Sequence, residues 1–156
     1  MKWFLPALLL LFPRLSLGAV NTAFAEQCVQ HYADRYGVPS EFIAALIDVE
    51  SRWNSAAISD KGALGLMQLM PETARRYGAS HPLDAEENIA AGTRYVTALM
   101  WEFHGDLRLV AAAYYAGDRW MIKNQFRPAN ADVVAYVQAV QQRYQIRRSS
   151  RERVGQ

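Results

Sequence analysis

Glu50 closes a strongly patterned apolar segment, and its position suits a general acid. Ile43, Ile47 and Glu50 are spaced i, i+4 and i+7, so on a helix they share one face. Burial on that face raises the pKa of a carboxyl, because the charged form loses hydration. The partial negative charge at the C-terminal end of a helix acts in the same direction. An acid that keeps its proton near neutral pH can protonate a leaving group. The alternative is a structural glutamate, bonded to backbone or paired with Arg52.

Three further motifs follow Glu50-Ser51 in order. They are Gly62–Pro71 (GALGLMQLMP), Asn88-Ile89, and Ala113–Gly117 (AYYAG). In this order and spacing the chain resembles the soluble lytic transglycosylase family, whose pattern is Glu-Ser, Gly-Leu-Met-Gln-x-Met-Pro, Asn-Ile and Ala-Tyr-Asn-Ala-Gly. The resemblance extends from Tyr36 to Tyr144. The chain departs from the pattern at Tyr115, where the family usually has Asn.

The resemblance implies a lysozyme-like catalytic domain that cleaves the β-1,4 bond between N-acetylmuramic acid and N-acetylglucosamine in peptidoglycan. In this family a single glutamate protonates the leaving oxygen and then removes a proton from the C6 hydroxyl of the muramic acid. The product is a 1,6-anhydromuramic end. By motif match Glu50 is the catalytic residue. The residues that match or adjoin family positions lining the glycan cleft are Ser51, Met67, Gln68, Tyr114 and Tyr115. The Tyr114 hydroxyl is expected to donate to Glu50.

Several of these residues also have structural interpretations. Met67 is the kind of side chain that fills a loop or core, and Tyr114 could be a core aromatic residue with a satisfied hydroxyl. Gln68 offers a donor and an acceptor for an acetamido group or a peptide stem. Asn88-Ile89 is expected to support the cleft without contacting substrate.

Most glycosidases use a second carboxylate as nucleophile or base. The downstream candidates are Asp60 and Glu72. Asp60 lies in a polar Ser-Asp-Lys turn, where Asx-turn bonding is the ordinary explanation. Glu72 follows Pro71, in the first turn of a helix, where a carboxylate is simply favourable. One acid without an evident partner agrees with the single-glutamate chemistry that the resemblance implies.

Helices must position these residues. The sequence predicts them over 40–52, 71–77, 85–104, 107–116 and from Asn130 or Asp132 through Tyr144. Asp84 and Glu87 have capping-box spacing, and Asp106 can cap the helix that Gly117 ends. Residues 55–70 are expected to form a loop or an irregular wall. No segment alternates with a two-residue period, so the fold class is all-α: an irregular helical domain with a catalytic cleft.

Residues 1–25 are predicted to be a secretory signal. Lys2 precedes an apolar run from Trp3 to Phe12, and Ala23-Phe24-Ala25 offers a small-x-small cleavage site. The run is much shorter than the roughly 20 apolar residues that span a bilayer. The mature form is therefore expected to be periplasmic, without a transmembrane span. An uncleaved amphitropic anchor is the alternative.

Charge divides the mature chain into two parts. The formal net charge of +2 comes from Lys2 and Arg14, both inside the predicted signal. The catalytic domain is assigned to residues 26–142. Residues 143–156 hold five Arg and one Glu and are expected to form a disordered basic tail. One short basic stretch gives no support for nucleic-acid binding.

Metal or cofactor binding is not expected. Cys28 is the single cysteine, so an internal disulfide cannot form, and the three histidines lie far apart without ligand spacing.

These features predict a periplasmic peptidoglycan lytic transglycosylase. Small members of the family often serve a trans-envelope machine, so components of a secretion, conjugation or pilus system are candidate partners beside the glycan strands. Two alternatives remain from the sequence. One is a hydrolytic lysozyme on the same fold, and the other is a non-catalytic glycan-binding or assembly module.

Overall fold

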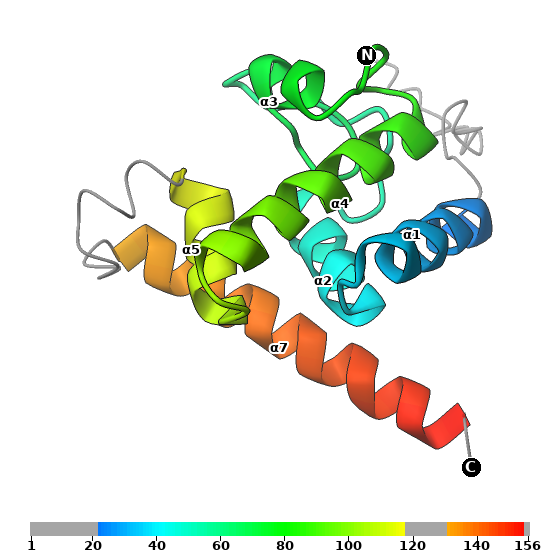
Figure 1. Ribbon diagram of the computed structural model, residues 1–156, viewed down its shortest axis with the longest axis vertical. Coiled ribbons are helices and arrows are strands. Elements are labelled where there is room, and N and C mark those ends of the chain that lie inside the picture. Colours follow the sequence, from blue (N-terminus) through cyan, green and yellow to red (C-terminus); the bar gives the residue numbers. More distant parts are fainter. Residues whose placement is uncertain (1–21, 118–130, 155–156) are drawn as a thin grey trace, which may run out of the picture.

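The computed structural model describes residues 22–117 and 131–154, and helix labels follow Figure 1. The helices are α1 (Thr22–Tyr36), α2 (Ser40–Glu50), α3 (Pro71–Arg76), α4 (Ala85–Glu102), α5 (Leu107–Ala116) and α7 (Ala131–Val154). The only β-structure in these ranges is two isolated bridges, Ile58 to Leu64 and Leu64 to Leu69. The predicted all-α, irregular fold is confirmed. Among the described residues, no helix is long and apolar enough to cross a bilayer.

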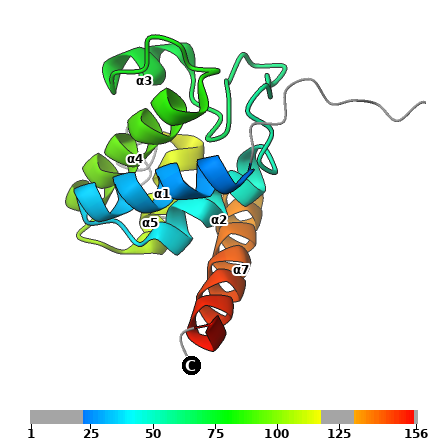
Figure 2. The same ribbon diagram turned by 90° about the vertical axis from the view of Figure 1, so that its right-hand side faces the viewer.

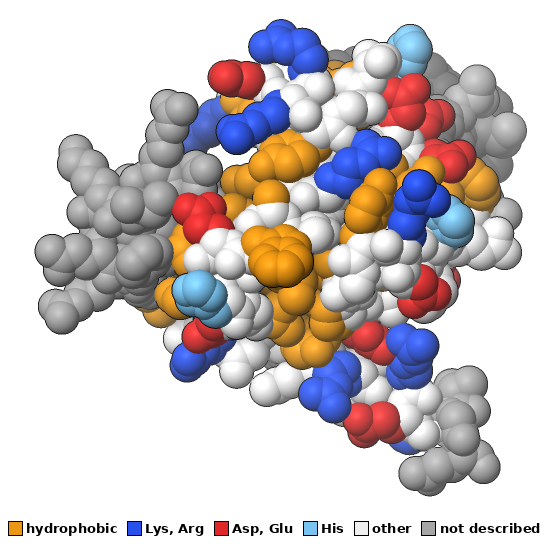
Figure 3. Space-filling model, viewed as in Figure 1, with side chains coloured by type: hydrophobic (Ala, Val, Ile, Leu, Met, Phe, Trp, Pro, Cys, Tyr) orange, Lys and Arg blue, Asp and Glu red, His pale blue; other side chains and the backbone are white. Residues whose placement is uncertain are grey.

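The core lies between α1, α2, α4, α5 and the first half of α7. Its largest fully buried side chains are Phe42, Ile43, Leu46, Ile47, Leu66, Met67, Leu69, Ile89, Val96, Leu99 and Val110. In Figures 1 and 2, α7 runs along α5 and α2 and extends past the other helices at its C-terminal end. Figure 3 shows an apolar band across the face along which α4 runs. On α4 Trp101 is 82% exposed.

Several helix ends follow the local signals. The Asp84 and Asp106 side chains accept hydrogen bonds from the first turns of α4 and α5. Gly117 ends α5 at a φ of 88°, which a side chain would disfavour. The capping box at Asp84 is only half formed, because the Glu87 carboxylate instead accepts from the N–H groups of Ser80 and His81.

Helix α2 differs from its prediction at both ends. Pro39, and not Ser40, is the N-cap residue, and the side-chain cap expected there is absent. At the other end the helix stops at Glu50 instead of Arg52, because Arg52 and Trp53 adopt left-handed backbone with φ of 52° and 67°. Glu50 is therefore the last helical residue.

The N-terminal segment forms a helix that the sequence did not predict. Helix α1 begins at Thr22, before the predicted cleavage site, and its Ala25 is 1% exposed. Cys28 is also buried. The apolar run from Trp3 to Phe12 and the alternative helix start at Asn130 lie outside the described residues.

The basic C-terminal segment corrects another expectation. Residues 143–154, predicted to be a disordered tail, continue α7 as a helix. Arg147 and Arg151 are four residues apart, so they share one helix face, and they meet Asp48 and Glu41 on α2. Paired charges on a packed helix favour order, whereas the sequence showed only a run of like charges.

Candidate active site

Glu50 meets a tyrosine from the far end of the chain. Its Oε1 accepts a hydrogen bond of 2.5 Å from the hydroxyl of Tyr136 on α7. Burial raises the pKa of Glu50 from 4.5 to about 7, against the opposing effect of the Tyr136 hydrogen bond, which favours the charged form. Burial also raises the pKa of Tyr136 well above its ordinary value, so this hydroxyl stays protonated and donates. The carboxyl is thus divided between its acidic and basic forms near neutral pH.

Tyr136 was not among the residues singled out from the sequence. It is 9% exposed and lies with Val133 and Val140 at spacings of i, i+3 and i+7 on the buried face of α7. A hydroxyl on a buried apolar face needs a hydrogen-bond partner. That requirement was the available signal, although it does not by itself identify Glu50 as the partner.

Tyr114 does not make the contact predicted for it. Its hydroxyl donates to the backbone oxygen of Met67 at 2.6 Å, and one hydroxyl proton cannot also serve Glu50. Its ring tilts against that of Tyr95 on α4, with centroids 5.2 Å apart. Tyr114 therefore ties α5 to the loop between α2 and α3.

Tyr115 lies at the surface. Its side chain is 49% exposed, and its ring stacks on the ring of Tyr136 with centroids 4.7 Å apart. The aromatic residue that replaces the family Asn thus covers the tyrosine that holds the acid. Tyr115 therefore does not fill the core, and its contact with a substrate stays a prediction.

The structure places Met67 in the core. It is fully buried, and its sulfur would lie 2.3 Å from a Cβ added to Gly92 on α4. The missing side chain of Gly92 makes the room that Met67 fills. Contact between the Met67 side chain and a substrate, expected from the motif, is not what the structure supports.

Gln68 shapes the loop wall. At a φ of 47° its side-chain amide donates to the backbone oxygens of Ala57 and Gly65. Its side-chain oxygen is the part left to face a ligand. Ser51, directly after the acid, has a buried hydroxyl oxygen without a hydrogen-bond partner among the described residues. Of the residues predicted to contact a substrate, Gln68 is partly exposed and Tyr115 is exposed, whereas the Ser51 hydroxyl oxygen is buried.

Asn88 holds the loop from inside the protein, as expected for a supporting residue. It is fully buried, accepts from the Met67 N–H at 2.8 Å, and donates to the backbone oxygens of Leu64 and Pro82. A Cβ on Gly65 would lie 2.5 Å from the Asn88 amide nitrogen, so only glycine fits there.

A hollow of about 260 Å³ opens beside these residues. It is lined by Gln68, Leu69, Met70, Thr73, Tyr95, Tyr114, Tyr115, Ala116 and Gly117. Tyr115 lines the hollow and stacks on Tyr136, so it joins this space to Glu50. The hollow has aromatic and amide walls, and Glu50 is linked to it through the side chains of Tyr136 and Tyr115.

The other carboxylates considered as partners lie at the surface. Asp60 is exposed in the loop, and Glu72 is exposed in the first turn of α3. Among the described residues, His, Cys, Asp and Glu side chains form no group of three or more that could hold a metal ion.

Comparison with known proteins adds sequence relatives. The family described as "Transglycosylase SLT domain" matches residues 27–134, well over half of the chain. The "Soluble lytic murein transglycosylase" of Escherichia coli (strain K12) is 33% identical over 125 residues, covering 71% of this chain and 19% of that protein. The "Transglycosylase" of Enterobacteria phage PRD1 is 31% identical over 97 residues, covering 60% and 36%. The chain thus spans only 19% to 36% of the length of these relatives.

A solved structure has the same fold. The X-ray structure of an inactive glutamate-to-glutamine mutant of lytic transglycosylase Slt from Pseudomonas aeruginosa superposes with a TM-score of 0.71 and 28% identity. The superposition covers 81% of this chain and 24% of that chain. The family match ends at residue 134, so Tyr136 and the rest of α7 lie beyond it.

Proposed function

Because this chain belongs to the transglycosylase SLT domain family, we propose that it is a peptidoglycan lytic transglycosylase. The observation that carries the proposal is Glu50, whose pKa burial raises to about 7. A general acid works best when its pKa lies near the operating pH, because it can then both give and take a proton. The reaction of this family requires one group to do both.

In the first step the protonated Glu50 donates to the glycosidic oxygen between N-acetylmuramic acid and N-acetylglucosamine. The C1–O bond breaks, and positive charge develops at C1 of the muramic acid. The Glu50 carboxylate that remains is stabilised by the hydrogen bond from Tyr136. The acid and its tyrosine thus share the negative charge that the proton transfer creates.

In the second step the carboxylate removes the proton of the C6 hydroxyl on the same muramic acid. The C6 oxygen forms a bond to C1, and Glu50 regains its proton. The product is a 1,6-anhydromuramic end, and no water is consumed. The exposed positions of Asp60 and Glu72 favour this route over a mechanism that uses a second carboxylate.

Two residues are proposed to contact the substrate. The Gln68 side-chain oxygen supplies a polar group at the hollow, and the exposed Tyr115 ring supplies an apolar surface there. N-Acetylated sugars present hydroxyls, acetamido groups and an apolar ring face, which suit these two side chains.

We also propose that residues 1–25 direct the protein to the periplasm, where it opens the wall for a trans-envelope assembly such as a secretion, conjugation or pilus system. The apolar run before Ala23-Phe24-Ala25 supports the export step. N-terminal sequencing of the protein recovered from the periplasm tests it, with Glu26 the expected first residue.

Mass spectrometry of the muropeptides released from purified sacculi tests the activity. The expected products carry 1,6-anhydromuramic ends, and Glu50→Gln is the matched inactive control. Reducing muramic ends as the main product would assign the protein to the hydrolytic lysozymes. A wild-type protein that binds sacculi and releases nothing would be a glycan-binding module.

A further inference from the structure

We infer that Arg147 is a positioning residue for Glu50. By clamping Asp48 and Trp53, it fixes α7 against the last turn of α2 and so keeps the Tyr136 hydroxyl on the Glu50 carboxyl. The inference rests on the proposed function for its kinetic part only. Tyr136 and Arg147 lie beyond residues 27–134, the segment that matches the family.

Arg147, Asp48 and Trp53 form a cluster of contacts, here called the Arg147 cluster. The Nε and Nη2 atoms of Arg147 each lie 2.7 Å from a carboxylate oxygen of Asp48, in a two-pronged pair. The Trp53 indole N–H donates to Asp48 at 2.7 Å, and the Arg147 guanidinium lies 5.1 Å from the Trp53 ring centroid. Burial alone raises the pKa of Asp48, but the bonds from Arg147 and Trp53 outweigh it and hold that pKa below its ordinary value.

Two residues of the Arg147 cluster lie close to the catalytic residue in the sequence. Asp48 lies two residues before Glu50, and Trp53 lies three residues after it. Arg52 and Trp53 both have positive φ, a backbone conformation that is unfavourable for residues other than glycine. The bonds that hold the Trp53 side chain help to keep this unfavourable backbone in place. The chain on both sides of Glu50 and Ser51 is therefore held by Asp48 and Arg147.

The Arg147 cluster also helps to fix the position of α7. Tyr136 and Arg147 are on the same helix, and both reach the last turn of α2, at Glu50 and at Asp48. A rigid helix that is fixed at one of these points is restrained at the other. A displacement of about 1 Å in a catalytic contact can change a rate by as much as 10²-fold.

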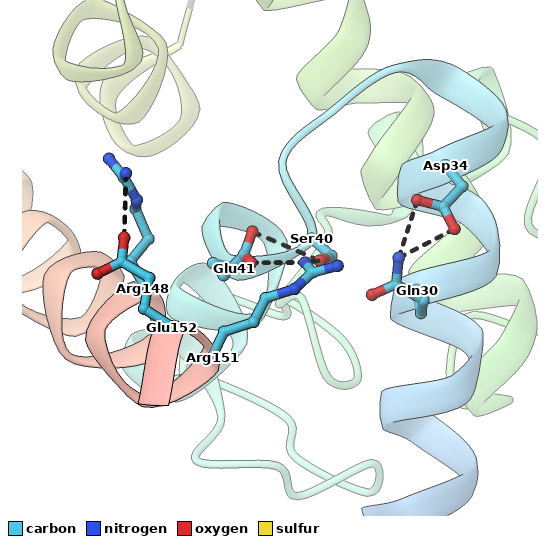
Figure 4. A network of polar contacts seen from close by, with 7 residues as sticks. All are labelled: Gln30, Asp34, Ser40, Glu41, Arg148, Arg151 and Glu152. Carbon is cyan, nitrogen blue, oxygen red and sulfur yellow. Dashed lines mark hydrogen bonds and ion pairs between the residues drawn. The ribbon is translucent and has the colours of Figure 1, made fainter. Parts of the chain in front are cut away.

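A second ion pair provides a control on the same helix. Arg151 reaches from α7 to Glu41 and Ser40 at the start of α2, as Figure 4 shows, with a distance of 2.6 Å to the carboxylate. Its side chain is 61% exposed, against 27% for Arg147. This pair joins the same two helices but lies at the other end of α2 from Glu50.

A double-mutant cycle separates positioning from general stability. The variants are Arg147→Met, Tyr136→Phe and the double variant, with Arg151→Met as the control. The first readout is kcat and KM for muropeptide release. The second is the pKa of the Glu50 carboxyl, followed by NMR on glutamate-labelled protein. Among the described residues, the titratable groups on α7 and α5 that interact electrostatically with Glu50 are Tyr136 and Tyr114, respectively.

Arg147→Met is expected to lower kcat about tenfold with KM within about twofold, and to raise the pKa of Glu50. Both effects should largely vanish in the Tyr136→Phe background, because Arg147 acts through that hydroxyl. A direct effect of the lost charge would persist there. Arg151→Met should leave kcat and the Glu50 pKa unchanged. If Arg147→Met unfolds the protein, Arg147→Lys, which keeps one charged contact, takes its place and should show the same changes in smaller measure.

Equal effects of Arg147→Met and Arg151→Met, or a full effect of Arg147→Met without the Tyr136 hydroxyl, would overturn the inference. A wild-type protein without muropeptide release would instead count against the proposed function. The NMR titration then still decides the positioning, because it requires no turnover.

Discussion

The hydroxyl of Tyr136 donates to Oε1 of Glu50 at 2.5 Å, although 86 residues separate the two in the chain. The contact opposes the effect of burial. Burial raises the pKa of Glu50, and the hydrogen bond lowers it by stabilising the carboxylate. The balance leaves the pKa at about 7, where the same carboxyl can act first as an acid and then as a base.

Glu50→Gln should abolish cleavage and stabilise the fold at alkaline pH. Glutamine can still accept from Tyr136 but has no transferable proton, so muropeptide release should fall by at least roughly 10²–10⁴-fold. Because the folded-state pKa of Glu50 is raised, wild-type stability is full below about pH 4.5 and declines as the pH rises through 7. The variant escapes this loss.

Chemical denaturation measures the second effect. The free energy of unfolding of Glu50→Gln should exceed that of wild type by up to about 3 kcal/mol at pH 8, and should match it near pH 4. An active Glu50→Gln variant would rule out the mechanism.

Tyr136→Phe should shift the pH dependence of cleavage upward. Removal of the hydroxyl takes away the hydrogen bond that lowers the pKa of Glu50, so the acid keeps its proton to higher pH. The descending limb of the pH–rate profile, expected near pH 7 in wild type, should move above it. The maximal rate should fall roughly tenfold or more, because the carboxyl is less well oriented. A limb that stays in place would show that another group controls it.

Tyr115→Asn restores the residue usual in the family and should be tolerated. The ring is 49% exposed, so its removal leaves no large cavity. The lost stacking on Tyr136 should lower the free energy of unfolding by about 0.5–1.5 kcal/mol. Thermal melts and muropeptide release on the same preparation measure both, with activity expected to be retained or raised. A fall in melting temperature like that of a core aromatic deletion would contradict the surface position.

Asn88→Ala should loosen the loop that carries Gln68. The three hydrogen bonds of this buried side chain disappear, and the Met67 N–H and the Leu64 and Pro82 carbonyls each lose a partner. The free energy of unfolding should fall by roughly 3–5 kcal/mol. Asn54→Ala is the control, since Asn54 makes a single exposed turn bond to Ala56. Urea unfolding should show a change within about 1 kcal/mol for the control. Similar losses in both variants would contradict the central role of Asn88.

Features that depend on neighbours along the chain could be predicted from the amino-acid order. Asp84, Asp106 and Gly117 mark helix ends because their side chains or φ angles act within one turn. The apolar spacing before Glu50 placed that carboxyl on a buried helix face for the same reason. The ordered motifs indicated the family, and the Gly-rich segment indicated an irregular wall.

Contacts between groups that are distant in the chain became known from the packing of the helices. Tyr136, rather than Tyr114, bonds to Glu50, and Met67 fills the space left by Gly92 instead of lining the cleft. Arg147 and Arg151, which looked like a solvated run, find acids on α2. Each outcome depends on how α7, α5 and the loop pack on α2. A helix pattern fixes which face a residue occupies, but it carries no information about the side chain that another helix brings to that face.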